Sequence, residues 1–293
     1  MPKTVVSRQG EDVVDTPTGR VPLERGRHMG VRTAGEGPAV VLLHGLPGSA
    51  AAWGEVQRDL ARDHQVLAPD LLGFGASSRP RVYEELSAEA QADALIDVLA
   101  EIDVKPAAVV GHDYGGPVAL WLYRKRPDLV PRLGLSASNA FTDTPIPLPI
   151  SAVTWPLVGH VLERILFSAP ALRQMLRQGA GEPRPALDPD VYVGDEGQQH
   201  TIRAIFSTSL RELEERYRTV EETLSGVEAP ALVAWGDADP FFGGEQGERT
   251  ASALARADFV LYEGCGHFVP DERPRELAAD LRRLLERPAG GCG

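Results

Sequence analysis

The stretch "GHDYGG", residues 111–116, places an aspartate between a histidine and a tyrosine and surrounds them with glycines. It follows the apolar run "AAVVG" (107–111) and precedes a helical stretch that ends near Pro127. A reactive side chain on a tight strand-to-helix turn needs small neighbours, because bulkier side chains would collide there. The pattern therefore predicts an elbow with Asp113 at its tip, where serine is more usual. The alternative is a strand-end loop whose aspartate only caps the next helix.

Short apolar runs bounded by turn residues recur along the chain and are typical of fully buried parallel strands. They cover residues 39–43, 65–70, 107–111, 132–138, 231–236 and 258–263. Between most of them lie helical stretches, such as 87–102, with Ser87 as its cap, and the amphipathic stretch 272–287. This alternation predicts an α/β fold with a mostly parallel sheet flanked by helices.

The alternation breaks between about Phe141 and Val227, where Pro-rich "TDTPIPLPI" precedes helical segments without a convincing strand. We predict a core of residues 1–140 and 228–293, with residues 141–227 inserted as a helical cap. The cap is expected over the carboxyl ends of the strands, the edge at which open α/β sheets bind ligands. The alternative is a helical linker packed elsewhere.

The amino-acid composition limits the classes of protein to which the chain can belong. The chain has 293 residues, 43% of them hydrophobic, which suits one large domain or a domain with an insertion. Its net charge of −12 argues against binding to nucleic acid or to an anionic membrane, since both need clustered positive charge. Cys265 and Cys292 can form no disulfide framework and show no metal-ligand spacing, so we expect free thiols. Without a signal-peptide pattern or an apolar run of bilayer length, a soluble cytoplasmic protein is expected.

A second motif, "LLHGLPGS" (42–49), follows the first strong strand. It places backbone amides at a strand end, where the N–H groups of Leu46 and Tyr114 are predicted to stabilise an oxyanion. His44 is expected to support the loop through hydrogen bonds rather than to take part in catalysis.

Two more motifs complete the set. In "WGDADPFF" (235–242) a strand runs into two aspartates, and "EGCGHFVPDERP" (263–274) is a strand-end loop that carries His267. Nucleophile, acid and histidine thus occur in the order of the α/β-hydrolases. Asp239, in the turn before a proline, is preferred as the acid, while Asp237 is interpreted as a turn residue that binds local amides.

With these motifs the sequence resembles the α/β-hydrolase superfamily from about residue 25 to 287. The "HGLP" and "GHDYGG" elements are similar to the branch that contains epoxide hydrolases and haloalkane dehalogenases, in which an aspartate replaces serine. The resemblance implies Asp113 as nucleophile, His267 as base and Asp239 as the acid that orients the histidine.

A carboxylate nucleophile suits a saturated carbon that bears a leaving group. Asp113 would displace that group and form an alkyl ester, so that one difficult hydrolysis becomes two easier steps. His267 would then activate water for attack on the ester. This chemistry requires neither a metal nor an organic cofactor, and we expect none.

The leaving group distinguishes the possible enzymes. Haloalkane dehalogenases hold the halide with side-chain N–H donors, but Tyr114 follows the nucleophile here and Leu46 stands where an asparagine is possible. Trp155 could supply one donor, although core packing is the commoner role for such a tryptophan. Epoxide hydrolases use cap tyrosines, for which the candidates are Tyr192 and Tyr217, with Tyr114 as a further one. An epoxide is therefore the first prediction and a halide the alternative.

Two other classes stay open. Asp113 could act as a general base in an esterase-like or lyase-like enzyme, or the chain could be a ligand-binding protein on the same fold. The predicted partner is a small hydrophobic substrate, with no nucleic acid and no membrane. The oligomeric state is not predicted.

Overall fold

The computed structural model describes residues 18–145, 150–155, 157–182 and 187–289. The strands of these residues form one sheet in the order β1-β2-β4-β3-β5-β6-β7-β8. Cys292 lies outside the described residues. None of the described helices has both the length and the apolarity needed to cross a bilayer.

Each of the predicted strands is present, and together they form the parallel part of the sheet. They are β3 (Ala39–Leu43), β4 (Gln65–Pro69), β5 (Pro106–His112), β6 (Leu133–Ser136), β7 (Ala231–Gly236) and β8 (Ala257–Tyr262). One expectation was wrong: β8 is only partly buried, because it is the edge strand and has a partner on one side alone. The mostly parallel α/β sheet is confirmed.

Two strands precede the predicted ones. β1 (Thr18–Pro22) and β2 (His28–Ala34) form an antiparallel pair, and β2 runs antiparallel to β4. Four of the five β1 residues are exposed, so this edge strand shows none of the apolar run that marks the buried strands.

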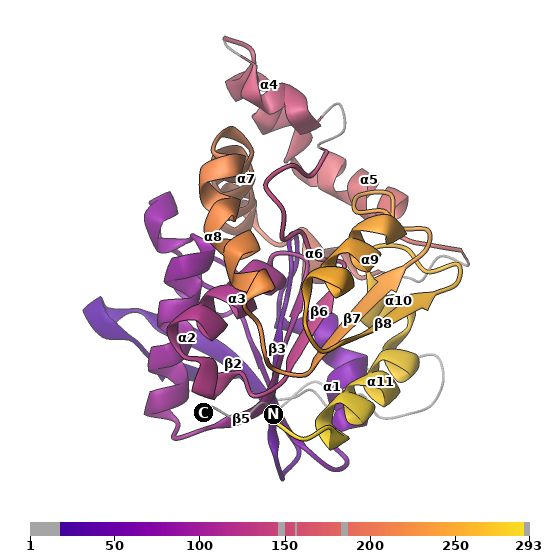
Figure 1. Cartoon of the computed structure of the whole chain (residues 1–293). Helices are drawn as coiled ribbons and strands as arrows, with labels where there is room; N and C mark the ends of the chain where they lie inside the picture. The colour runs from indigo at the N-terminus through magenta and orange to yellow at the C-terminus, as the bar shows by residue number, and fades with distance from the viewer. Residues whose placement is uncertain (1–17, 146–149, 156, 183–186, 290–293) are drawn as a thin grey trace, which may run out of the picture.

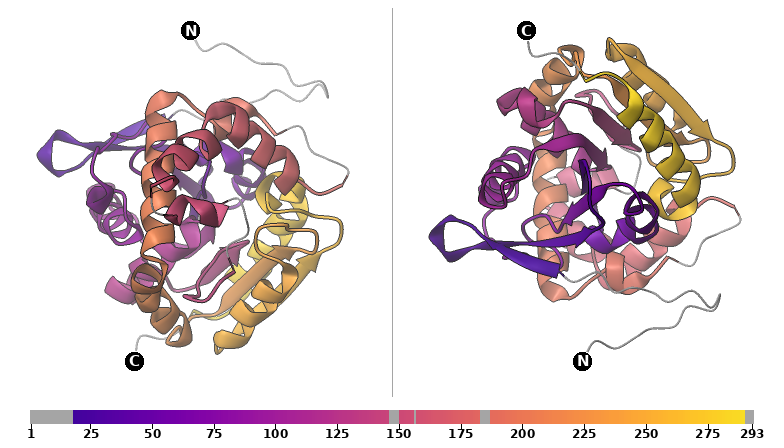
Figure 2. Two further views of the ribbon diagram at one scale, coloured as in Figure 1. Left: turned by 90° about the horizontal axis from the view of Figure 1, so that it is seen from above. Right: turned by 90° about the horizontal axis from the view of Figure 1, so that it is seen from below.

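Helices cover both faces of the sheet (Figures 1 and 2). On one side, α2 (Ala88–Glu101) packs against α3 (Gly115–Lys125). On the other side, α1 (Gly54–Leu60) packs against α11 (Pro274–Glu286). The predicted cap of α2 is present, because the Ser87 hydroxyl accepts a hydrogen bond of 3.2 Å from the N–H of Ala90.

The described part of residues 141–227 contributes helices and no strand. These are η5 (Ile150–Thr154), α4 (Gly159–Leu166), α5 (Ala169–Gly179), α6 (Pro189–Tyr192), α7 (Glu196–Arg211) and α8 (Leu213–Ser225). Figure 1 shows α4, α5 and α7 above the edge at which the parallel strands end, while α8 descends to pack on α3.

The other described helices are short or lie at the rim. They are η1 (Glu24–Gly26), η2 (Ala50–Trp53), η3 (Tyr83–Glu85), η4 (Pro127–Leu129), α9 (Gly244–Ala253) and α10 (Val269–Glu272). Of these, α9 packs on β7 and β8.

Candidate active site

The elbow is a strained turn between β5 and α3. Asp113 has a φ of +49°, in the left-handed region that residues with a side chain seldom adopt. Its N–H donates to the carbonyl of Ser136 at 3.0 Å, and its carbonyl accepts from the Ser138 hydroxyl at 2.8 Å. Both partners belong to β6 and the residues just after it. Neighbouring strand ends therefore hold the aspartate in its unusual conformation.

The glycines of the motif are required by close backbone packing. A Cβ atom at Gly111 would collide with the backbone of Gly115, and one at Gly116 would collide with the Ser138 side chain. Gly45, in the facing loop, leaves room for the Asp113 side chain in the same way. The small neighbours predicted from the sequence thus have a direct steric cause.

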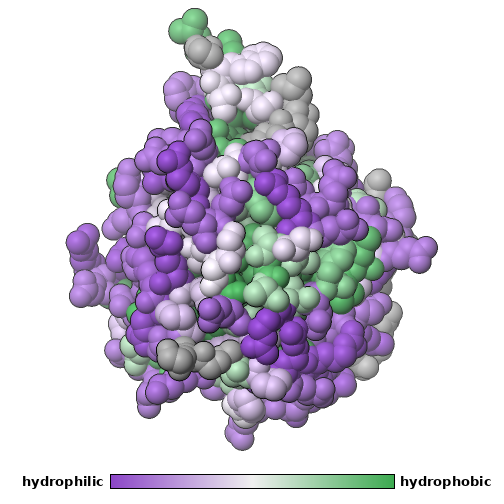
Figure 3. Space-filling view, viewed as in Figure 1, coloured by the Kyte–Doolittle hydropathy of each residue, from purple (hydrophilic) through white to green (hydrophobic). Residues whose placement is uncertain are grey.

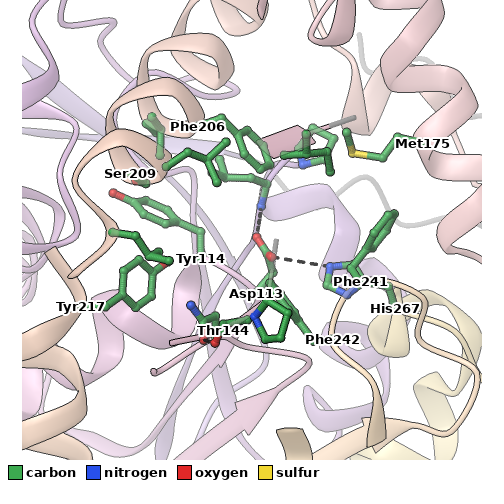
Figure 4. Close-up of a pocket in the computed structure, with 18 of the residues that line it drawn as sticks. Asp113, Tyr114, Thr144, Met175, Phe206, Ser209, Tyr217, Phe241, Phe242 and His267 are labelled. Atoms are coloured by element: carbon green, nitrogen blue, oxygen red, sulfur yellow. Dashed lines mark hydrogen bonds and ion pairs between the residues drawn. The ribbon is translucent and has the colours of Figure 1, made fainter. Parts of the chain in front are cut away.

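Asp113, His267 and Asp239 lie together at the carboxyl edge of the sheet. The Nε2 atom of His267 is 3.6 Å from Asp113 Oδ2, as Figure 4 shows. The Nδ1 atom of the same ring is 3.0 Å from Asp239 Oδ2. The other carboxylate oxygen of Asp239 accepts the N–H groups of Phe241 and Phe242 at 2.8 and 3.1 Å. Asp237 is exposed, whereas Asp239 is buried. The structure thus brings Asp239, and not Asp237, to the histidine.

The loop that carries His267 is held from several sides. Its backbone N–H donates to the carbonyl of Gly179 at 2.7 Å, and its carbonyl accepts from His112 Nε2 at 2.9 Å. Glu272 Oε2 accepts the N–H groups of Gly181 and Gly266, both at 2.8 Å. These bonds fix the imidazole ring relative to the elbow and to the end of α5.

The charges of the buried groups stabilise one another. Burial lowers the pKa of His267, but the carboxylates of Asp239 and Asp113 outweigh burial and raise that pKa to about 10. Burial alone would raise the pKa of Asp113, yet its hydrogen bond and attraction to His267 leave that pKa below the ordinary value. For His112, burial and the nearby His267 lower the pKa to about 4. At neutral pH the site therefore holds an ionised Asp113, a protonated His267 and a neutral His112.

The facing loop contributes a backbone donor. The N–H of Leu46 donates to Asp113 Oδ1 at 2.6 Å (Figure 4). His44 supports this loop, as expected: its Nδ1 lies 3.0 Å from the Gly45 carbonyl, and its Nε2 accepts the Leu71 N–H at 3.0 Å. Tyr114 directly precedes α3, so its own N–H belongs to the free donors at the start of that helix.

A cavity of about 120 Å³ lies beside Asp113 and His267. Its lining is mainly apolar and includes Met175, Ile205, Phe206, Phe241, Phe242 and Phe268. Its polar side chains, apart from the aspartate and the histidine, are Asn139, Thr144, Ser209, Tyr114 and Tyr217. Asp113 and His267 thus face a largely apolar pocket between the sheet edge and the helices above it.

The candidate substrate-binding residues are placed differently from one another. Tyr217 lines the cavity, and burial is the main cause that raises the pKa of its hydroxyl. Tyr192 is buried, does not line the cavity, and donates its hydroxyl to Asp271. Trp155 is 53% exposed and also lies outside the cavity lining. The Tyr114 hydroxyl donates to the Leu86 carbonyl at 2.7 Å, so it is already engaged.

Several lining residues escaped the sequence reasoning. Asn139 and Thr144 follow β6, and their position after a strand end was the available signal. Phe241 and Phe268 lie within the motifs that carry Asp239 and His267, so proximity in the chain indicated them. Ser209, within α7, carried no such signal.

Comparison with known proteins agrees with this geometry. A sequence model described as the alpha/beta hydrolase fold matches residues 38–222. The chain therefore belongs to the α/β-hydrolase family, and it is a hydrolase.

The individual relatives have low sequence identity to this chain, but the alignments cover most of its length. An uncharacterized protein of Mycobacterium tuberculosis is 28% identical over 283 residues, covering 93% of this chain and 82% of that protein. A soluble epoxide hydrolase of Corynebacterium sp. (strain C12) is 28% identical over 267 residues, covering 85% of this chain and 91% of the relative. The solved structure of a haloalkane dehalogenase from Bradyrhizobium elkani superimposes with a TM-score of 0.77 at 19% identity, covering 92% and 97% of the two chains. At that identity the structural likeness concerns the fold alone.

Proposed function

We propose that the protein opens a small hydrophobic epoxide to a diol through an alkyl ester of Asp113. The observation that carries this proposal is the chain of contacts from Asp113 through His267 to Asp239, beside a mostly apolar cavity. The N–H of Leu46 also donates a hydrogen bond to Asp113. In this proposal Asp113 is the nucleophile, His267 the base and Asp239 the acid that orients the base.

The first step is attack at carbon. The ionised Asp113 displaces with its Oδ2, because Oδ1 is held by the Leu46 N–H. A carbon–oxygen bond forms to the carboxylate, the ring carbon–oxygen bond breaks, and the epoxide oxygen leaves with the electron pair. We assign the proton that this oxygen needs to the hydroxyl of Tyr217, which lines the cavity. The Coulomb interaction between Tyr217 and Asp113 supports their proximity.

The second step is hydrolysis of the ester. Esterification removes the negative charge of Asp113, which is one cause of the raised pKa of His267. The pKa of the imidazole therefore falls, and His267 releases its proton to restore the Tyr217 phenol that donated in the first step. The neutral imidazole then acts as the base and takes a proton from water. The resulting hydroxide adds to the Asp113 carboxyl carbon, and the Leu46 and Tyr114 N–H groups stabilise the oxyanion. Collapse breaks the ester bond, and the departing oxygen takes the proton of the new carboxyl group. The diol then leaves, and the carboxylate is restored with one oxygen taken from water.

The lining of the cavity favours an epoxide over a halide. Among the described residues, no tryptophan lines it, and Trp155 lies outside it. Asn139 lines it, but its amide group is tied to the local turn through bonds with the backbone of Phe141. The phenol of Tyr217 suits an epoxide oxygen, which needs a proton, better than it suits a halide ion. The long alignment with a soluble epoxide hydrolase supports the same choice.

We also propose that residues 141–227 form the cap of this enzyme, with residues 1–140 and 228–293 as its core. The helices of the described residues in that range support this division. So does the cavity, whose lining combines Met175, Phe206 and Tyr217 from these helices with Asp113 and His267 from the core.

Heavy-oxygen water provides the test. A single turnover of an epoxide panel in labelled water is expected to leave label in the peptide that contains Asp113, as seen by mass spectrometry. Unlabelled Asp113 despite diol formation would contradict the ester. Release of halide from a haloalkane panel, without diol from the epoxides, would instead favour dehalogenation.

A further inference from the structure

Most of the exposed large apolar side chains lie together at the far end of the helices above the sheet. Seven large apolar residues of the described chain are exposed, and five of them are Trp155, Leu157, Val158, Val161 and Ile165. We call these five residues the α4 tip. Leu157 is 96% exposed, which is extreme for a leucine. Figure 1 shows α4 projecting at the top of the molecule, and Figure 3 shows hydrophobic surface there.

The orientation of α4 is fixed by internal polar contacts. Its acidic residue, Glu163, accepts the Ser207 hydroxyl at 2.6 Å and forms an ion pair with Arg211 at 2.9 Å, both from α7. Arg211 also donates to the Val153 carbonyl at 3.1 Å. These contacts turn a charged side chain inward, toward α7.

The opposite face of the helix is apolar. Val158, Val161 and Ile165 follow the spacing that places side chains on one face of a helix. Helices on a protein surface normally leave polar residues in solvent, whereas α4 packs Leu166 on the core and leaves a second set of apolar side chains exposed. Exposed apolar side chains on a helix that specific bonds hold in place mark an interaction surface.

The segment that contains the α4 tip and α5 has a net charge opposite to that of the whole chain. Residues 150–180 contain Arg164, Arg173 and Arg177 but only one acidic residue, so three positive charges and one negative charge leave +2. The chain as a whole carries −12. All three arginines are exposed, and Glu163 is taken by Arg211. The local charge therefore suits an anionic partner, although the average charge suggests the contrary.

We propose that the α4 tip and its three arginines dock onto an anionic phospholipid surface. The apolar side chains would enter the boundary between head groups and acyl chains, and the guanidinium groups would bind lipid phosphates. A tryptophan beside aliphatic residues suits this boundary, because its ring is amphipathic.

A second copy of the chain fits the same surface less well. In a symmetric pair, each tip would meet the other tip, so the two groups of arginines would face one another. Two chains of −12 would also repel at longer range. An anionic bilayer avoids the repulsion between two groups of arginines, because its lipid phosphates can bind the guanidinium groups.

Vesicle sedimentation tests the proposal with the full chain. The vesicles contain phosphatidylcholine alone or equal parts of phosphatidylcholine and phosphatidylglycerol. The unchanged protein is expected to sediment with the anionic vesicles, and less so as salt rises. The triple variant Leu157→Ser, Val161→Ser, Ile165→Ser is expected to bind at least about tenfold more weakly. Arg173→Gln with Arg177→Gln should also weaken binding, by roughly tenfold.

A matched control uses the exposed apolar residues elsewhere. Val82→Ser with Leu261→Ser removes side chains that are 52% and 45% exposed, and it should leave vesicle binding unchanged. All variants are first checked for an unchanged melting temperature. Equal loss in the control and the triple variant, or no binding of the unchanged protein, overturns the proposal. So does a dimer, seen by sedimentation velocity without vesicles, that the triple variant abolishes, because a second copy is then the occupant.

Discussion

At the sheet edge, each reactive side chain sits on a short turn and is held by backbone hydrogen bonds. Asp113 is bound through its N–H, its carbonyl and its carboxylate, and Asp239 accepts two amides besides the histidine. The helices above this edge contribute long side chains whose placement depends on how each helix is rotated. Tyr217 faces the cavity, Tyr192 is buried against Asp271, and Trp155 is exposed. Local turns therefore determine the positions of the side chains at the sheet edge, whereas helix packing determines which side chains form the wall of the pocket.

The largest expected effect belongs to the centre. His267→Gln should lower steady-state turnover of an epoxide by about 10⁴-fold or more, because it removes the base of the second step. The first step should survive, so the variant is expected to accumulate a covalent adduct on Asp113, detectable by intact mass. Normal turnover in this variant would remove His267 from the role of base.

Asp239→Asn and Asp237→Asn form a matched pair, two residues apart. The first should lower turnover by roughly 10²- to 10⁴-fold, because it disturbs the tautomer and orientation of His267. The second should change turnover less than about twofold, since Asp237 is exposed. Steady-state kinetics decides between them, and the reverse ranking would exchange the two assignments.

Tyr217→Phe and Tyr192→Phe compare two cap tyrosines. Loss of the Tyr217 hydroxyl should lower the rate of ester formation by about 10²-fold, because the leaving oxygen loses its proton donor. Loss of the Tyr192 hydroxyl should leave that rate nearly unchanged but destabilise the fold by about 1–3 kcal/mol, because Asp271 loses a buried partner. Single-turnover kinetics and urea unfolding separate the two effects. A kinetic defect confined to the Tyr192 variant would move the donor to that residue.

The effect that is smallest for each step of the measurement, at most about tenfold in the unfolding equilibrium per pH unit, concerns stability and pH. The pKa of His267 is raised to about 10, above its ordinary value of 6.5, so folding favours the protonated form. The stabilisation is fully present below pH 6.5 and is lost as pH rises toward 10, with a slope of at most about 1.4 kcal/mol per pH unit. Unfolding free energies measured between these pH values should fall less steeply for His267→Gln. Parallel slopes for the two proteins would show that His267 is not strongly coupled to the carboxylates.

The features that the sequence could predict are divided in the same way between the sheet edge and the helices above it. The buried parallel strands and the elbow were predictable, because each leaves a local pattern of apolar runs and glycines. β1 was missed, since its exposed edge position imposes no such pattern. The charged sequence around Tyr217 was compatible with a solvent-facing side chain, yet Tyr217 lines the cavity. Whether a helical side chain faces solvent or a cavity depends on what packs around the helix, and a single sequence does not contain that information.

The sequence alone predicted the α/β-hydrolase fold and the chain order of Asp113, the pair Asp237 and Asp239, and His267, because short-range sterics and strand burial leave patterns in neighbouring residues. Only the tertiary structure decided that Asp239 rather than Asp237 meets the histidine, and that Tyr217 rather than Tyr192 faces the cavity. It also decided that α4 leaves Val158, Val161 and Ile165 exposed to solvent. These outcomes depend on the rotation and approach of segments far apart in the chain, which packing and long-range hydrogen bonds determine.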